Sequence, residues 1–370
     1  MVHRIAFALA AALAAGIAVA QSPAPGPQPQ MRFRTPGPDG AGAPLPALPD
    51  TEENRLAILE RLAATLEENF VFPDIGGRYA AALRTKATAG GYAGLGERFG
   101  ETVTADLQAI HPDRHLRFGP TGPRLAGAAA GTGARRVMRM PDGAEAIGDS
   151  GWIAEGVGYI NLTLFPGDPA VVERVRAFME AHRGDRAIIF DIRRHRGGGL
   201  AEMDVIFSYL FARETLLVGM DTRTAAERNG GNPLGELATL RDAAAPESVI
   251  RRMHFALPGA QATPLRDARI YVLTSRRSGS AAEHFALAMK RTGRATLIGE
   301  PTAGAGHYGR VVDFGGYAAF VPVGRTYDPD TNQGWEGTGV APNVEMPADQ
   351  ALDEALRRLG VTAEQRRPLA

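Results

Sequence analysis

The chain has 370 residues, and its 41 basic and 41 acidic side chains give a formal net charge of zero, which offers no support for nucleic-acid binding. It contains no cysteine, so disulfides, thiol catalysis and cysteine-ligated zinc are excluded. Its length is sufficient for two domains and a large hydrophobic core.

Residues 1–20 have the features of a secretory signal peptide. A short basic start (His3, Arg4) precedes an apolar stretch, and Ala18-Val19-Ala20 forms a small-x-small cleavage pattern before Gln21. The alternative is an uncleaved membrane anchor, but the apolar stretch is shorter than the roughly 20 residues that a spanning helix needs. We therefore expect an exported protein, periplasmic or secreted, with no membrane span after cleavage.

Residues 21–49 are rich in Pro, Gly and Ala without a period, which predicts a linker. Apolar residues at helical spacing then begin near Asp50, a candidate N-cap, and continue to His111. These patterns predict a helical N-terminal domain over residues 50–118. The connecting segment, residues 119–156, has weak periodicity and predicts no element.

From Val157 onward, strand and helix patterns alternate, which is typical of an α/β core. We expect this core over residues 157–348, followed by a C-terminal helix and tail over residues 349–370. The predicted elements are strands at Val157–Phe165, Ala187–Ile192, Ile270–Leu273 and Thr296–Gly299, helices from Asp168, Leu200 and Ser280, and a hairpin around Gly315-Gly316.

Ser280 lies at a predicted junction between a buried strand and a helix. A turn containing Gly279 precedes it, and the helical pattern begins at Ser280 itself. Its hydroxyl is therefore expected at the positive end of a helix, next to a backbone N–H that could bind an oxyanion. The alternative interpretation is an ordinary N-cap serine.

Three glycines, Gly197, Gly198 and Gly199, follow the strand predicted at Ala187–Ile192. Glycines at this position allow the backbone to approach a ligand closely with its N–H groups exposed. Neither of the two common phosphate-binding glycine motifs is present. The residues alone leave two interpretations open: an oxyanion-binding loop and a tight strand-to-helix turn.

A serine nucleophile needs a base within hydrogen-bond reach. His284 lies four residues beyond Ser280 on the same helix face, although core packing is the common role for such a histidine. His115 lies at a predicted helix-to-strand junction, where loops often carry catalytic residues. The residues alone do not decide between them.

Several sequence blocks, in order along the chain, resemble the S41 serine peptidases, the tail-specific or carboxy-terminal processing protease family. The similarity is greatest to the branch containing the repeats of interphotoreceptor retinoid-binding protein and the tricorn protease core. The blocks are Leu66-Glu-Glu-Asn-Phe-Val-Phe-Pro73 with Asp113-Arg-His115-Leu, Asp191-Ile-Arg-Arg-His-Arg-Gly-Gly, Thr274-Ser-Arg-Arg-Ser-Gly-Ser280-Ala-Ala-Glu, Gly299-Glu-Pro-Thr-Ala-Gly-Ala-Gly306 and Trp335-Glu336-Gly-Thr-Gly-Val-Ala-Pro.

This resemblance implies a Ser–His–Glu triad of Ser280, His115 and Glu336. It also implies an oxyanion hole formed by the backbone N–H groups of Gly197, Gly198 and Ala281.

The chain departs from the family pattern at three places. Ala305 stands where bacterial tail-specific proteases have their lysine base. Lys290, ten residues after Ser280, would lie about 15 Å away along a helix and could not replace it. His195 occupies the usual asparagine position, and residues 119–156 are too few for the PDZ domain that many members carry.

The resemblance implies a ClpP/crotonase-like α/β core of strand-strand-helix units preceded by a small helical N-terminal domain. The expected protein is an exported serine peptidase that hydrolyses peptide bonds of a polypeptide substrate through an acyl-enzyme, with no cofactor or metal. The alternatives are a non-catalytic protein that binds peptides or apolar ligands on the same fold, and an esterase or amidase using the same triad. The sequence predicts no oligomeric state.

Overall fold

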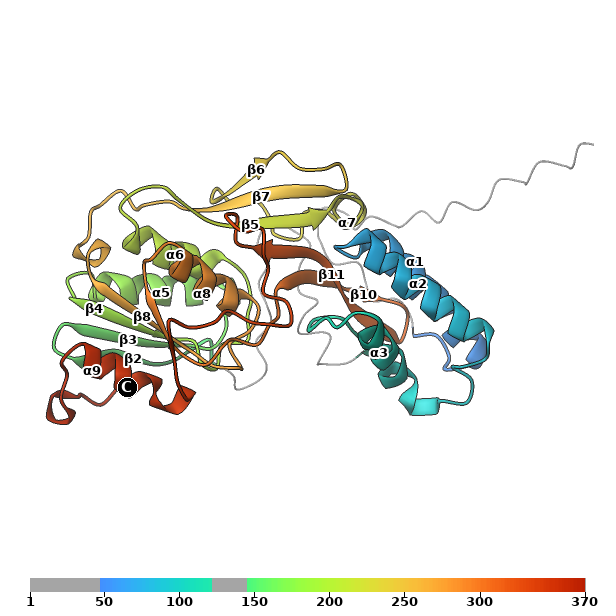
Figure 1. The fold of residues 1–370 in the computed structure, drawn as a ribbon, viewed down its shortest axis with the longest axis horizontal. Helices are drawn as coiled ribbons and strands as arrows, with labels where there is room; N and C mark the ends of the chain where they lie inside the picture. Colours follow the sequence, from blue (N-terminus) through green and yellow to red (C-terminus); the bar gives the residue numbers. More distant parts are fainter. Residues whose placement is uncertain (1–46, 122–144, 370) are drawn as a thin grey trace, which may run out of the picture. The chain divides into compact units, whose positions relative to one another are not determined.

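The computed structural model describes residues 47–121 and 145–369 (Figure 1). The predicted signal peptide and most of the predicted linker lie outside the described residues. Of the helices in these two ranges, none combines the length and apolar character that crossing a bilayer requires. The described strands form two six-stranded sheets, which confirms the α/β class predicted from the sequence.

The N-terminal part of the described chain is helical, as its apolar spacing predicts. The cap of α1 is Thr51, whose side chain accepts the N–H of Asn54 at 3.3 Å. The sequence-based assignment of Asp50 as the cap was wrong by one residue, because the Asp50 carboxylate pairs with Arg55 instead. Pro73 starts α2 at a position where its missing N–H costs no hydrogen bond. The helices are α1 (Glu52–Asn69), α2 (Pro73–Thr88) and α3 (Phe99–Ile110).

The buried faces of these helices share a hydrophobic cluster with residues of the hairpin around Gly315-Gly316. Leu62, Leu66 and Tyr79 are fully buried there, together with Phe314 and Val321. Burying side chains of this size contributes roughly 1.5–3 kcal/mol each. The helical segment is therefore packed onto β11 (Tyr317–Tyr327), a strand far later in the chain, and this packing positions the loop after α3.

The first sheet is antiparallel in all its pairings, with the order β1-β11-β5-β7-β6 and β10 paired to β11. The predicted hairpin around Gly315-Gly316 is confirmed as the connection between β10 and β11. The short helix α7 (Thr224–Gly230) follows β5. The strands are β1 (Arg117–Pro120), β5 (Thr215–Arg223), β6 (Leu240–Ala243), β7 (Val249–Ala256), β10 (His307–Asp313) and β11 (Tyr317–Tyr327).

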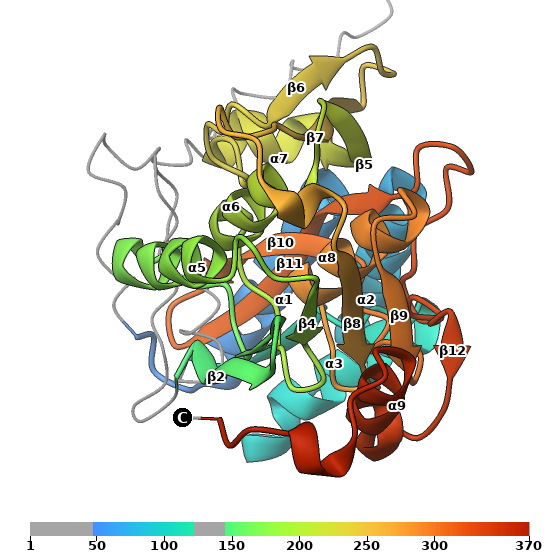
Figure 2. The same ribbon diagram turned by 90° about the vertical axis from the view of Figure 1, so that its left-hand side faces the viewer.

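The second sheet has the order β12-β9-β8-β4-β3-β2 and is parallel except for the β2–β3 pair. Figure 2 shows β4, β8 and β9 in this order beside one another. The strands are β2 (Ile147–Ala154), β3 (Val157–Leu162), β4 (Ala187–Asp191), β8 (Arg269–Thr274), β9 (Thr296–Gly299) and β12 (Val344–Glu345).

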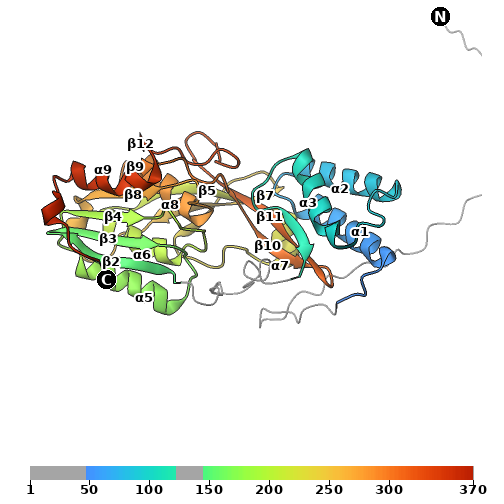
Figure 3. The same ribbon diagram turned by 90° about the horizontal axis from the view of Figure 1, so that it is seen from below.

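Helices cover both faces of the second sheet, so its central strand β4 is buried along its whole length. Because side chains alternate along a strand, Ile188 and Phe190 enter one cluster while Ala187 and Ile189 enter another. The first cluster includes α5 (Pro169–Ala181), α6 (Ala201–Leu210) and α8 (Ala281–Arg291); the second includes α9 (Ala351–Arg358), seen beside β9 in Figure 3. Short 3-10 helices occupy Gly96–Arg98, Pro264–Arg266, Ala348–Gln350 and Ala363–Gln365.

The core elements predicted from the sequence are confirmed within a few residues. Asp168 caps α5 by accepting the N–H of Ala170 at 2.8 Å, and Pro169 occupies the first helical position. Sequence reasoning missed β2, which lies within the connecting segment for which no element was expected, and it did not identify β5, β6 or β7. Part of that connecting segment, residues 122–144, is outside the described residues. The exact domain boundaries remain predictions.

Candidate active site

Ser280 lies between the end of β8 and the start of α8, in an unusual backbone conformation. Its φ of +59° and ψ of −119° fall outside the regions that a non-glycine residue normally adopts. An ordinary N-cap has an extended backbone, whereas unusual conformations of this kind cluster at active sites and ligand-binding sites. Two hydrogen bonds maintain it: Ser280 N–H donates to Glu283 Oε2 at 2.8 Å, and Gly279 N–H donates to the His195 carbonyl at 2.9 Å.

The glycine loop after β4 contacts Ser280 so closely that no side chain could be added. A Cβ on Gly197 would lie 2.7 Å from Ser280 Cβ and 3.1 Å from Ser280 Oγ. A Cβ on Gly198 would lie 2.0 Å from the Phe165 carbonyl oxygen. Both glycines have φ values above +110°, which a side chain would also disfavour.

The backbone N–H groups around Ser280 differ in their hydrogen bonding. Gly197 N–H donates to His195 Nδ1 at 3.1 Å and is therefore engaged. Among the described residues, none accepts a hydrogen bond from the N–H of Gly198 or of Ala281. Ala281 is the first residue of α8, where the helix dipole adds a positive potential. These two amides are free to bind an anionic oxygen.

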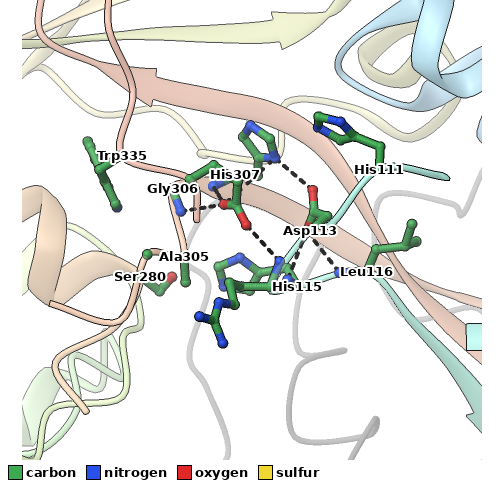
Figure 4. Close-up of polar contacts among 12 residues, drawn as sticks. His111, Asp113, His115, Leu116, Ser280, Ala305, Gly306, His307 and Trp335 are labelled. Carbon is green, nitrogen blue, oxygen red and sulfur yellow. Dashed lines mark hydrogen bonds and ion pairs between the residues drawn. The ribbon is translucent and has the colours of Figure 1, made fainter. Parts of the chain in front are cut away.

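His115 lies in the loop between α3 and β1, and Figure 4 shows its ring pointing toward Ser280. The ring stacks on Phe320 with centroids 5.3 Å apart. Its Nδ1 is buried and has no hydrogen-bond partner among the described residues. Burial lowers the pKa of His115 to about 4, so the ring is neutral at pH 7 and able to accept a proton. No hydrogen bond joins the ring to Ser280 Oγ in the described part of the structure.

Glu336 follows Trp335 in the loop between β11 and β12 and binds backbone amides from two distant segments. Its Oε1 accepts the N–H of Arg114 at 2.6 Å, while Oε2 accepts the N–H groups of Gly306 at 2.6 Å and His307 at 3.2 Å (Figure 4). Burial, reinforced by the nearby Asp113 charge, raises the pKa of Glu336. The carboxylate thus lies directly beside the turn that carries His115.

Asp113, His115 and Glu336 are the only acidic and histidine residues in the described ranges whose ligand atoms cluster as a metal site requires, within 4.8 Å of one another. However, both oxygens of each carboxylate already accept hydrogen bonds from N–H groups. A divalent cation would have to displace these bonds. The donor set therefore fits a hydrogen-bonded network around a histidine better than a metal centre.

Sequence reasoning did not identify the Asp113–His307 pair, which lies beside the predicted triad. Asp113 Oδ2 lies 2.7 Å from His307 Nδ1, and Asp113 Oδ1 accepts the N–H groups of His115 and Leu116. Burial would by itself raise the pKa of Asp113, but the hydrogen bond from His307 and the His307 charge lower it. No local pattern in the sequence relates these two residues, which are 194 positions apart.

The alternative bases have other partners. His284 Nε2 contacts His254 Nδ1 at 2.8 Å, and burial lowers the pKa of His284 well below its usual value. Lys290 donates its ammonium to the Ala341 carbonyl at 2.7 Å. Ala305, at the family's lysine position, has only a backbone contact, from its N–H to Glu283 Oε2 at 2.8 Å. In the described structure, none of these residues has a hydrogen bond to Ser280 Oγ.

A profile of peptidase family S41 matches residues 156–346, more than half of the chain. The chain therefore belongs to peptidase family S41 and is a serine-type peptidase by that membership.

The fold is also similar to solved structures. It resembles a photosystem II D1 C-terminal processing protease (15% identity, TM-score 0.52, covering 84% of this chain and 98% of that one). It also resembles a lipoprotein from Streptococcus agalactiae (13%, 0.52, 85% and 97%) and the tricorn protease (15%, 0.51, 83% and 36%). At these identities, the likeness shows the fold alone.

Proposed function

We propose that this protein hydrolyses peptide bonds of a polypeptide substrate through an acyl-enzyme formed on Ser280. The observation that carries the proposal is the strained backbone of Ser280, held in contact with Gly197 and beside the free N–H groups of Gly198 and Ala281. Backbone strain of this kind costs about 1–3 kcal/mol and persists where function requires it.

In the first step, Ser280 Oγ attacks the substrate carbonyl carbon as its proton passes to His115. The neutral state of the His115 ring at pH 7 supports this role. The oxyanion is bound by the N–H groups of Gly198 and Ala281, and each such donor contributes about 10²–10³ in rate. The C–N bond then breaks, and the imidazolium returns the proton to the leaving amine.

Glu336 has the third role in this proposal. It fixes the position of the His115 turn through Arg114 N–H and places a negative charge near the imidazolium that forms during the reaction. In the second step, water attacks the acyl-enzyme, His115 accepts its proton, and Ser280 is released with that proton. The N–H of Gly197 already donates to His195, so Gly197 supports the site only through its contact with Ser280.

Fluorophosphonate labelling of the purified protein tests this proposal directly. We expect a covalent adduct that mass spectrometry locates on Ser280, and no adduct on a Ser280→Ala variant. The His284→Gln variant is a matched control, since it changes a buried histidine of the same helix and should still be labelled. Failure of the folded wild-type protein to react, or an adduct on another residue, would overturn the assignment.

We also propose export to the periplasm or medium, with cleavage after Ala20. The supporting pattern lies in residues outside those the structure describes. Expression of the full chain followed by intact-mass analysis should give a mature form that begins at Gln21. A product that retains Met1 in a membrane fraction would contradict this proposal.

A further inference from the structure

The turn that carries His115 is held by a buried pair of side chains that the triad does not include. Asp113 accepts the N–H groups of both His115 and Leu116 with Oδ1, at 2.8 and 3.0 Å. Its other oxygen, Oδ2, is 2.7 Å from His307 Nδ1. Asp113 therefore shapes the His115 turn, and His307 determines where the Asp113 carboxylate lies.

His307 is itself fixed on several sides. It is nearly fully buried at the start of β10, and the rings of Phe70 and Phe72 approach it edge-on with centroids 6.4 and 5.4 Å away. Its backbone N–H donates to Glu336, whose Oε2 is 3.8 Å from the His307 ring. With Nδ1 directed at a carboxylate, this nitrogen carries the proton that is donated. Of the other titratable or charged groups, His115 interacts electrostatically with His307, and Arg325 lies opposite His307 on β11.

We propose that His307 is a positioning residue for the peptidase reaction: its Nδ1–H holds Asp113, which holds the turn that brings His115 to Ser280. The proposal rests on the proposed function, in which His115 is the base. His307 contacts neither substrate nor Ser280, so it acts only through Asp113. A misplacement of about 1 Å in a catalytic group can reduce the rate about 10²-fold, which makes this hydrogen bond significant for catalysis.

The competing explanation is that His307 only fills space beneath Phe70 and Phe72. Two substitutions of His307 distinguish these explanations, because each explanation predicts the opposite order of activity for the two variants. Asparagine is smaller but can place an N–H donor where Nδ1 lies, whereas leucine fills the space and has no donor. If His307 positions Asp113, His307→Asn retains more activity than His307→Leu. If it only packs, His307→Leu retains more.

His182 provides a matched control within the same chain. It is also a buried histidine whose Nδ1 lies 2.7 Å from a carboxylate, that of Asp185. This pair packs against Trp152 and Phe178, and neither member contacts Ser280, His115 or Glu336 in the described structure. Substituting His182 therefore measures what loss of a buried histidine–carboxylate pair does to stability alone.

The experiment measures kcat and KM on a peptide substrate, with folded fractions checked by thermal melting. We expect His307→Leu to lower kcat about 10²-fold with KM changed less than about twofold, and His307→Asn to stay within about tenfold of wild type. His182→Leu and His182→Asn should lower the melting temperature and leave kcat unchanged. Equal losses in the two His307 variants, or higher activity in His307→Leu, would overturn the proposal.

A second measurement keeps this test separate from the proposed function. Imidazole signals of His115 in ¹⁵N-histidine NMR report the position of its ring whether or not the protein cleaves peptides. We expect these signals to move in His307→Leu and in Asp113→Leu, and to remain close to wild type in His307→Asn. Unchanged His115 signals in His307→Leu would reject the positioning role, whereas absence of fluorophosphonate labelling in wild type would reject only the proposed function.

Discussion

The nucleophile and the base of the candidate site are supported in different ways. Ser280 is held within the parallel-sheet core, by the carboxylate of Glu283 three residues later and by the glycine loop after β4. His115 belongs to the helical N-terminal segment and is held by residues far along the chain. The contact from Arg114 N–H to Glu336 spans 222 residues, and the Asp113–His307 contact spans 194.

Residues 304–307 connect the hydrogen bonds that hold Ser280 with those that hold the His115 turn. The N–H groups of residues 304–305 donate to Glu283, and those of residues 306–307 donate to Glu336. Four consecutive amides are thus divided between the carboxylate beside the nucleophile and the carboxylate beside the base. The nucleophile is therefore built entirely within the α/β core, whereas the base depends on correct docking of the helical N-terminal segment.

The largest expected effect is on the nucleophile side. Ser280→Ala should lower kcat by about 10⁴-fold or more, because no acyl-enzyme can form. The melting temperature should stay near that of wild type, since the hydrogen bonds of Ser280 with Glu283 and His284 use only its backbone N–H and carbonyl. Steady-state kinetics with a fluorogenic peptide checks this, and residual activity above a few per cent would place the nucleophile elsewhere.

On the base side, His115→Ala is compared with His284→Ala. Loss of the general base should lower kcat about 10²–10⁴-fold, while His284→Ala should mainly reduce stability by breaking its contact with His254. Kinetics corrected for folded protein separates the two. A greater loss of kcat in the His284 variant would reverse the assignment of the base.

The two carboxylates should respond differently to a neutral replacement. Glu336→Gln should lower kcat about 10²-fold, less than Ser280→Ala, because Glu336 orients the base and forms no bond with substrate. Glu283→Gln should lower kcat and also reduce the free energy of unfolding by about 1–3 kcal/mol, because one of the two oxygens that accept buried hydrogen bonds, among them that of Ser280 N–H, is replaced by a donor. Denaturant titration and kinetics on both variants test this division.

The smallest expected effect is at the glycine loop. Gly197→Ala adds a Cβ 2.7 Å from Ser280 Cβ at a φ of +113°, and should lower kcat about 10-fold or more by shifting the nucleophile. Gly199→Ala is the control, because its added Cβ would meet only the Phe165 carbonyl oxygen at 3.9 Å. Equal kinetics in both variants would remove Gly197 from the site.

The same difference determines how much of the molecule was predictable from the sequence. The strand, turn and helix around Ser280 were predicted from local patterns, and the structure confirms them. The local sequence around His115 did not favour this residue over His284 as the base. Only the resemblance to peptidase family S41 pointed to His115. The Asp113–His307 pair was missed because no local pattern relates residues 194 positions apart.

The pH dependence of Ser280 acylation tests the central claim, that a neutral His115 accepts the Ser280 proton. A protonated ring cannot accept it, so the rate should rise as pH increases through the pKa of His115. Burial lowers that pKa to about 4, so the midpoint should lie below the ordinary histidine value of about 6.5. We expect this rise in wild type and its loss in His115→Ala. A rise only above about pH 9, or an unchanged profile in His115→Ala, would contradict it.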